Sequence, residues 1–324
     1  MQAVRLVDGA PRVVDVAPPE PGPGWVRVRV RSAGICASDL HLIDSGFPVA
    51  ATLGHEIAGI TDDGTPVAIE PIVPCGACGP CSAGAYHLCD TAAFTMIGIG
   101  TDGGMAEQLV VPERSLVALP AGIDLADASL VEPLAVAVHG LRLGGHTGST
   151  DTAVVGAGTI GLAAIAAASH TVAAGGGGHL SVLARHDHQR AAAEALGASV
   201  LDDPADEASI ADLVIEAAGT ADAFAQAAHL VRPGGTIVLL SIHWSPTPTP
   251  GVGLWLKEAR VVPAMTYGAG PDGRDIDHAA EVLATSPEVA RAMITHRRPL
   301  GAATDAFDLA RQRSGGVIKV VLEP

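Results

Sequence analysis

The part of the chain after Thr152 alternates short apolar strands with helices, and this alternation limits the possible folds more than any other feature of the sequence. The expected strands cover 153–155, 180–183, 213–215 and 236–240. The expected helices begin near Ile160 and continue across 188–196 and 221–230. Strands that alternate with helices of this length form βαβ units, in which neighbouring strands run parallel. We therefore expect an α/β fold with a doubly wound parallel sheet here.

A glycine-rich turn, VVGAGTIG, lies between the first of these strands and the first helix. In a G-x-G-x-x-G turn the first glycine (Gly156) permits the tight bend, the second (Gly158) lets the backbone approach a pyrophosphate, and the third (Gly161) packs the helix against the strand. Thr159 and Ile160 open the helix, whose N-terminal N–H groups face the phosphates. A packing turn in an Ala- and Gly-rich chain is the alternative, because a lone motif is weak evidence. The strand and helix on either side favour dinucleotide binding in a Rossmann domain.

The end of the next strand indicates which dinucleotide is bound. A carboxylate there binds the ribose 2′-OH of NAD, whereas arginine accommodates the 2′-phosphate of NADP. Here Ala184 stands in place of the acid and Arg185 follows it directly, with Arg190 close behind. Asp187 would fill the acidic role if the strand ran three residues longer, and a merely solvated Arg185 is the simpler alternative. The sequence favours NADP over NAD.

Residues 1–125 contain short β segments separated by Gly, Pro and Asp, with no long helical period. Residues 25–31 (WVRVRVR) alternate, and we expect a half-exposed strand with Trp25 and the valines on one face and the arginines on the other. Further strands are expected at 58–60, 67–69, 106–111 and 116–119. A helix at 131–143 follows, and the chain is expected to end with a helix after Tyr267 and a strand at 317–322. The length of 324 residues fits two domains.

Four cysteines lie close together in a Gly- and Pro-rich loop, CGACGPCSAGAYHLC. They are Cys75, Cys78, Cys81 and Cys89. Four thiolates at this spacing can close a tetrahedral Zn²⁺ site and so stabilise a loop that has no core of its own. A redox CxxC pair would leave two thiols without a role, and an iron–sulfur cluster is a further alternative. The spacing predicts a structural zinc site.

The fifth cysteine, Cys36, stands apart, and His55 and Glu132 follow it at long intervals. A thiolate, an imidazole and a carboxylate with an open fourth position make a catalytic zinc site. Each residue also has a simpler interpretation: a buried thiol, a hydrogen-bonded core imidazole, and a carboxylate at a helix N-terminus.

Taken in order, these motifs resemble the zinc-dependent medium-chain alcohol dehydrogenases, and within them the polyol, ketose and butanediol branch. The motifs are GICASDLH, LGHEIAG, CGACGPCSAGAYHLC, DGGMAEQLVVP, VEPLAVAVHG, VVGAGTIG, VIEAAG, RPGGTIVLLS and ITHRRPL…GGVIKVVLEP. The resemblance implies a discontinuous GroES-like β domain at 1–133 and 266–324 that carries both zinc sites. It also implies a Rossmann domain at 134–265.

The resemblance assigns roles around the metal. It implies that Cys36, His55 and Glu132 hold the catalytic zinc, and that Glu56 is a transient ligand or a partner of water. Asp39 is expected to accept from the ring of His55 and fix its tautomer.

The resemblance also assigns the proton path and further cofactor contacts. Ser38 resembles the hydroxyl that contacts the substrate oxygen, and His41 the group that passes the proton to solvent. Ser241 and Ile242, at the end of RPGGTIVLLS, are expected to contact the cofactor together with the glycine turn. Thr266 departs from the branch, which often has Arg at this position.

Composition limits the partners and the compartment. The chain has 19 Lys and Arg against 35 Asp and Glu, a net charge of −16, which disfavours nucleic acid and anionic membranes. The uncharged run 152–184 is interrupted by glycines and is rich in alanine, so we expect a strand and a helix rather than a membrane span. An odd cysteine count and an N-terminus without an apolar signal segment predict a cytoplasmic protein.

The predicted function is reversible hydride transfer between a secondary alcohol (a polyol, a diol or a sugar-like compound) and NADP(H) or NAD(H), with two Zn²⁺ per chain. The alternatives are a zinc-independent quinone or enone reductase and a non-catalytic NADPH-binding sensor. The partner is a small alcohol or ketone, and the resemblance implies a homodimer or homotetramer.

Overall fold

The computed structural model describes residues 1–47, 49, 51–202, 208–312 and 315–324. The chain divides into two compact units. Unit 1 comprises Met1–Glu132 and Ile294–Pro324, and unit 2 comprises Pro133–Met293.

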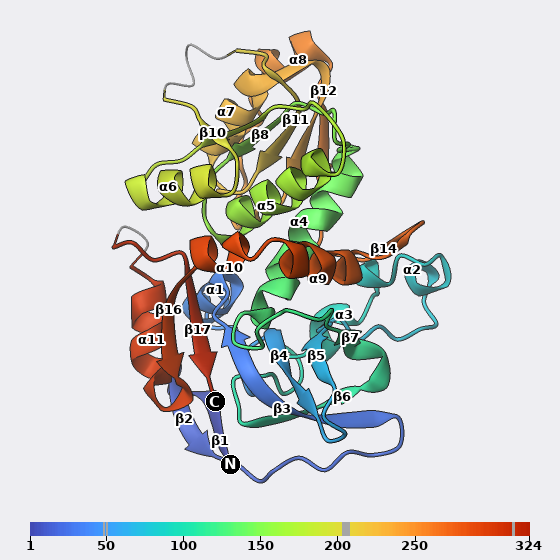
Figure 1. Ribbon diagram of the computed structural model, residues 1–324, viewed down its shortest axis with the longest axis vertical. Helices are drawn as coiled ribbons and strands as arrows, with labels where there is room; N and C mark the ends of the chain where they lie inside the picture. The colour runs from blue at the N-terminus through green and yellow to red at the C-terminus, as the bar shows by residue number, and fades with distance from the viewer. Residues whose placement is uncertain (48, 50, 203–207, 313–314) are drawn as a thin grey trace. The chain divides into compact units, whose positions relative to one another are not determined.

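Unit 1 is built mainly of β-strands (Figure 1). Its large sheet has the order β16-β17-β3-β4-β5-β7, with β6 paired to β3. The strands are β3 (Trp25–Gly34), β4 (Glu56–Thr61), β5 (Pro66–Ile69), β6 (Gln108–Pro112), β7 (Leu116–Ala118), β16 (Ile294–Pro299) and β17 (Lys319–Glu323). A separate antiparallel hairpin is formed by β1 (Gln2–Val7) and β2 (Ala10–Asp15). Because β17 pairs with β3, the end of the chain completes the sheet that the first segment began.

Short helices connect the strands of unit 1. They are α1 (Ala37–Asp44), α2 (Gly79–Ser82), α3 (Ala92–Thr95) and α11 (Ala303–Ala310). Single 3₁₀ turns occur at Tyr86–Leu88, Glu113–Ser115, Ala128–Leu130 and Leu300–Ala302. The expected strands at 58–60, 67–69 and 116–119 are confirmed within a residue or two. The expected strand at 106–111 begins at Gln108, because Ala106 forms an isolated bridge with Ala3 instead.

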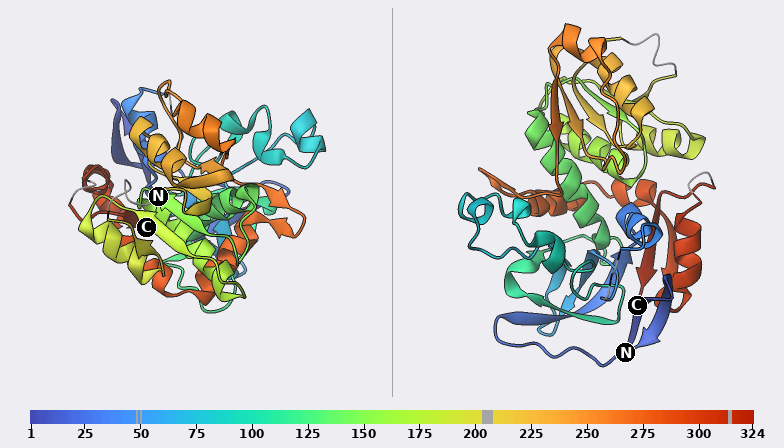
Figure 2. Two further views of the ribbon diagram at one scale, coloured as in Figure 1. Left: turned by 90° about the horizontal axis from the view of Figure 1, so that it is seen from above. Right: turned by 180° about the vertical axis from the view of Figure 1, so that it is seen from behind.

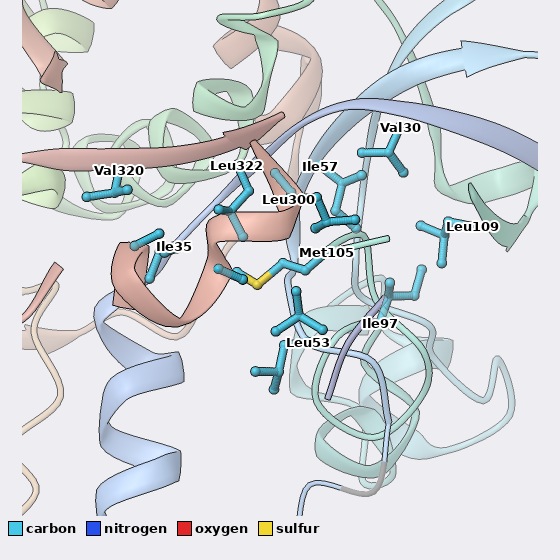
Figure 3. Packing of buried hydrophobic residues seen from close by; sticks show 14 of the residues in the cluster. Val30, Ile35, Leu53, Ile57, Ile97, Met105, Leu109, Leu300, Val320 and Leu322 are labelled. Carbon is cyan, nitrogen blue, oxygen red and sulfur yellow. The ribbon is translucent and has the colours of Figure 1, made fainter. Parts of the chain in front are cut away.

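The core of unit 1 joins side chains from the sheet and from the loops that cover it, as Figure 3 shows. Valines of β3 contribute, with Val28 fully buried. Trp25, in contrast, is 45% exposed, so the prediction that it shares the face of the valines was wrong. Side chains alternate along a strand, and Trp25 therefore points to the same side as Arg27 and Arg29.

Unit 2 contains a six-stranded sheet in the order β10-β9-β8-β11-β12-β13, and every pair of neighbours is parallel. Its strands are β8 (Thr152–Val155), β9 (Leu180–Leu183), β10 (Ser199–Val200), β11 (Ala211–Glu216), β12 (Val231–Leu239) and β13 (Arg260–Pro263). In chain order the strands are arranged 3-2-1-4-5-6, which is the arrangement of a Rossmann fold. The predicted doubly wound sheet is confirmed.

Helices pack on this sheet in two layers (Figures 1 and 2). One layer contains α5 (Thr159–Ala173) and α6 (Asp187–Ala195), with α9 (Asp275–Thr285) and α10 (Glu288–Met293) packed against α5, and the other layer contains α7 (Ala221–Leu230) and α8 (Val252–Lys257). Helix α4 (Val131–Gly144) precedes the first strand, and a small hairpin is formed by β14 (Ala269–Gly270) and β15 (Gly273–Arg274). Among the helices of the described ranges, none is both long and apolar enough to cross a bilayer.

The division between the units differs from the expected domain boundary at residue 266. Helices α9 and α10 contact α5, and α10 also contacts α6. Buried Asp275 binds two residues of α4, with 2.7 Å from Arg142 Nε to Oδ1 and 2.8 Å from His139 Nδ1 to Oδ2. Residues 266–293 therefore belong to unit 2 by their contacts, and the chain returns to unit 1 at Ile294.

Candidate metal and cofactor sites

The four-cysteine loop brings its thiols together. The sulfur atoms of Cys75, Cys78, Cys81 and Cys89 all lie within 4.8 Å of one another. Backbone N–H groups point at the sulfurs, with 3.2 Å from Cys75 N to Cys89 Sγ and 3.4 Å from Cys78 N to Cys75 Sγ. All the cysteines are free thiols rather than disulfides.

The ionisation of these thiols fits a metal. The N–H of Cys75 lowers the pKa of Cys89 to about 6, whereas desolvation raises the pKa of Cys81 to about 12. Four sulfur atoms this close together cannot all ionise unless a cation balances their charge, and a bound metal would hold all four as thiolates. The donor set is the tetrahedral Cys₄ arrangement that structural zinc prefers.

A second group forms where β3 and β4 lie side by side. Cys36 follows the end of β3 and caps the N-terminus of α1, and His55 directly precedes β4. The register of the two strands sets Gly34 opposite Glu56. The ligand atoms of Cys36, His55 and Glu56 consequently lie within 4.8 Å of one another.

Gly34 makes room for this arrangement. A Cβ atom at this position would lie 1.9 Å from Glu56 Oε2, closer than any two non-bonded atoms can approach. The carboxylate of Glu56 thus reaches across the strand pair only because residue 34 has no side chain.

Asp39 orients the ring of His55. The Nδ1 atom of His55 lies 3.4 Å from Asp39 Oδ1, and its Nε2 lies 3.3 Å from Ser38 Oγ. Asp39 is itself held by the N–H of Cys36, 3.0 Å from Oδ2. Burial lowers the pKa of His55, but the carboxylate of Asp39 and the sulfur of Cys36 outweigh burial and hold the pKa well above its usual value. A carboxylate behind the imidazole is the arrangement that fixes the tautomer of a metal-binding histidine.

The carboxylate of Glu56 has a cationic partner that was not predicted from the sequence. Lys319, on β17, is 2% exposed, and its Nζ lies 2.6 Å and 2.7 Å from the two carboxylate oxygens of Glu56. The same ammonium donates to the backbone oxygen of Ile35, at 3.1 Å. A sequence feature that could have predicted this buried ion pair is the lysine within the apolar run VIKVVL.

Glu132 lies outside the group formed by Cys36, His55 and Glu56. It is 6% exposed, and burial raises its pKa to about 7 against the opposing effect of His55. A buried carboxyl in that state suits a metal ligand, because a cation would restore its charge and satisfy its lone pairs.

The two expected relay residues both lie on α1. Ser38 contacts His55 through its hydroxyl, and His41 lies one helical turn further along and is half-buried.

The glycine turn of unit 2 has the geometry that its motif requires. Gly156 has a φ of +95°, in the left-handed region that favours glycine. A Cβ on Gly161 would lie 1.8 Å from the backbone oxygen of Gly156, whereas a Cβ on Gly158 would meet no atom within 4 Å. Gly158 thus faces open space at the N-terminus of α5, where a pyrophosphate can approach. Thr159 and Ile160 form the first turn of that helix.

Strand β9 ends at Leu183, so Asp187 is not at its end but in the first turn of α6. Ala184 is buried and Arg185 is exposed. Arg190 is engaged elsewhere, donating to the backbone oxygen of Ala184 at 3.0 Å and to Asp202 at 3.2 Å.

Ser241 and Ile242 follow the end of β12. Ile242 is exposed, whereas Ser241 donates its hydroxyl to the buried carboxylate of Glu216. The imidazole of His243 contacts the same carboxylate, at 3.1 Å. Neither Glu216 nor His243 was predicted from the sequence to be a site residue.

Known proteins match the chain along nearly its whole length. Residues 22–121 match the family model of the alcohol dehydrogenase GroES-like domain, and residues 126–323 match that of the glucose dehydrogenase C-terminus. The 2-dehydro-3-deoxy-L-galactonate 5-dehydrogenase of Pseudoalteromonas atlantica is 31% identical, over 89% of this chain and 88% of its own length.

Solved structures agree with this match. A putative zinc-binding dehydrogenase from Sinorhizobium meliloti bound to NADP has a TM-score of 0.87 and 30% identity, covering 100% of this chain and 99% of its own. Galactitol-1-phosphate dehydrogenase from Escherichia coli has a TM-score of 0.87 and 28% identity, covering 100% of both chains.

Together with the GroES-like and Rossmann domains, these matches define an NAD(P)-dependent oxidoreductase that acts on secondary alcohols. The chain belongs to the zinc-dependent medium-chain alcohol dehydrogenase family. The resemblance expected from the sequence motifs is thereby confirmed, as are the fold class and the reaction class.

Proposed function

We propose that this enzyme is a zinc-dependent dehydrogenase of polyols or sugar-derived alcohols that prefers NADP and holds two Zn²⁺ per chain. The observation that supports this most is that the ligand atoms of Cys36 and His55 lie within 4.8 Å of each other, with the carboxylate of Asp39 beside both residues. Ser38 lies beside them and can contact a substrate oxygen.

Cys36 and His55 would hold the catalytic metal, with Glu132 as the third protein ligand. Glu56 is the competing candidate, but Lys319 already balances its charge. A thiolate and one carboxylate together offset the two charges of Zn²⁺. When bound, Zn²⁺ supplies Lewis-acid polarisation of the substrate oxygen. Ser38 would accept the hydroxyl proton of the alcohol while it releases its own, and His41 would pass a proton on toward solvent.

The relatives support a polyhydroxylated substrate. One is named for a deoxy-galactonate and another for galactitol 1-phosphate, and both names describe carbon chains that carry several hydroxyl groups. We extend that substrate class, without naming one compound, to this chain.

The preference for NADP rests on Arg185 and on the acid that Ala184 replaces. Asp187 begins α6 and is poorly placed to bind a ribose 2′-OH at the end of β9. An exposed guanidinium directly after the strand is suited to a 2′-phosphate.

An apolar patch at one edge of unit 2 supports a homodimer, or a homotetramer that contains it. Strand β13 is the last in the sheet order, and exposed apolar side chains gather in the segments around it. They are Trp244, Val252, Trp255, Leu256, Val261 and Met265. An exposed edge strand can pair with its own copy about a two-fold axis, and a patch of this kind marks an interface.

The five free thiols agree with a reducing compartment such as the cytoplasm.

The decisive experiment combines metal analysis with a substrate panel. We expect two zinc ions per purified chain and oxidation of polyols, diols or sugar alcohols with NADP in preference to NAD. A single zinc would contradict the catalytic site, and a strong preference for NAD would contradict the role of Arg185. Turnover of quinones or enones that survives chelation would favour the zinc-independent reductase. Cofactor binding without turnover across the panel would favour the sensor.

A further inference from the structure

A fully buried carboxylate in unit 2 joins the two loops that follow β11 and β12. Glu216, the last residue of β11, is 0% exposed. One of its oxygens, Oε1, accepts the N–H groups of Ala218 and Gly219, each at 2.8 Å. The other, Oε2, accepts the hydroxyl of Ser241 and faces His243 Nε2 at 3.1 Å.

Such a carboxylate is stable in the interior only because donors surround it. An unpaired buried carboxylate is strongly destabilising, so the four donors and the carboxylate hold one another in place. On its far side the His243 ring contacts Thr247, with 2.9 Å from Nδ1 to Oγ1, and Phe224 packs edge-on against the ring at 6.1 Å. His243 therefore links the loop at 241–247 to the end of β11.

The start of the loop after β12 is also held by backbone bonds, since the N–H groups of Leu240 and Ser241 donate to the backbone oxygen of Glu216 at 2.9 Å and 3.3 Å. Ile242 and Trp244, on either side of His243, are both more than half exposed, and residues 245–250 form no helix or strand. The loop after β11, in turn, lies against the glycine turn. Ala217 N donates to Val155 O at 2.9 Å, and a Cβ on Gly156 would meet Ala218 Cβ at 2.9 Å.

These loops lie at the carboxyl edge of the sheet, where a dinucleotide binds across the point at which the strand order reverses. The adenosine ribose belongs to the β9 side of β8, since the residue that selects NAD or NADP follows β9. Strands β11 and β12 lie on the opposite side of β8, so the loops after them face the nicotinamide half.

We propose that Glu216 and His243 are positioning residues that hold Ser241 and Ile242 in the conformation that binds the nicotinamide half of the cofactor. The pair acts through the loop and does not itself react. This inference rests on the proposed cofactor role of Ser241 and Ile242 and adds the residues that preorganise them. A preorganised loop binds more tightly because less conformational freedom is lost on binding.

The test measures dissociation constants for NADPH and NADH by fluorescence in His243→Leu and His243→Gln, with His278→Leu as the control. His278 lies on α9, away from these loops. His243→Leu removes the donor to Glu216, and we expect both constants to rise about tenfold, as for the loss of a hydrogen bond to a charged group. Glutamine can still donate to Glu216, so His243→Gln should stay within about threefold of wild type, and His278→Leu should match wild type.

Hydrogen exchange supplies the second readout. The amides of Ala218, Gly219 and residues 241–243 should exchange faster in His243→Leu and remain protected in His243→Gln. If His243→Leu does not fold, Thr247→Val tests the same link from the far side of the ring, with a smaller expected rise of about threefold.

The outcomes separate the two proposals. Unchanged cofactor affinity in His243→Leu, or an equal loss in His278→Leu, would overturn the positioning role while leaving the enzyme assignment intact. Failure of wild type to bind either cofactor would overturn the proposed function itself, and the positioning role with it.

Discussion

The two candidate metal sites of unit 1 are assembled in opposite ways. The four-cysteine site comes from one short segment, 75–89, and its spacing alone brings the thiols together. The Cys36 site draws on residues at the start of α1, at the start of β4, in α4 and in β17, and exists only after the sheet has formed. The first site can therefore act as a local staple for a loop, whereas the second depends on the fold that it serves. Removing a ligand should accordingly affect stability at the first site and chemistry at the second.

The sharpest test of this difference is Cys36→Ser. We expect turnover to fall by at least about a thousandfold, because the metal-dependent charge stabilisation is lost. One of two zinc ions should disappear, while the melting temperature changes little. Metal content, turnover and thermal unfolding measured on one preparation provide the check, and an active Cys36→Ser enzyme would remove the catalytic assignment.

Lys319→Met tests whether the buried pair supports the second site. Removing one partner of a buried ion pair leaves an uncompensated charge and costs about 3 kcal/mol or more. We expect a large drop in the free energy of unfolding, because the buried carboxylate of Glu56 loses its cationic partner. The double variant Lys319→Met/Glu56→Gln should recover most of the lost stability. No recovery in the double variant would show that the lysine acts through packing rather than through charge.

Cys89→Ser tests the four-cysteine site, where we expect an effect on stability rather than on turnover. Loss of one ligand from a structural zinc should release that ion and lower the melting temperature by several degrees. Turnover per folded molecule should remain near the wild-type value. A fall in turnover as large as that of Cys36→Ser would erase the distinction between the two sites.

The smallest effect is expected in unit 2, with Arg185→Ala. The KM for NADP should rise about tenfold through the loss of a charge-assisted contact to the 2′-phosphate, while the KM for NAD stays unchanged. Initial-rate kinetics with both cofactors measure the ratio. An equal change for both would assign Arg185 to the solvated surface.

Features of short sequence range were predictable. The glycine turn, the cysteine loop and the alternation of strands with helices each depend on residues that lie close together in the sequence. Their spacing is therefore enough to predict them. The structure agrees with the predicted fold, and the comparisons confirm the family. The face of β3 on which Trp25 lies also follows from local alternation. The prediction for Trp25 was wrong because residues 25, 27 and 29 are two positions apart, so Trp25 lies on the face of the arginines.

Contacts of long sequence range were not predictable. Lys319 meets Glu56 across 263 positions and His243 meets Glu216 across 27, and nothing in either local pattern specifies the partner. The return of the chain to unit 1 at Ile294 likewise follows from the packing of α9 and α10 on α5, which no composition change marks.

The sequence by itself thus determined which chemical groups this protein has and which local geometries they adopt. Spacing fixes a thiol cluster or a phosphate-binding turn because a few bonds join its members. Only the tertiary structure decided which buried charged groups pair with each other. In the interior each charge must find a partner, and that partner is chosen by the register of strands and the packing of helices rather than by proximity along the chain.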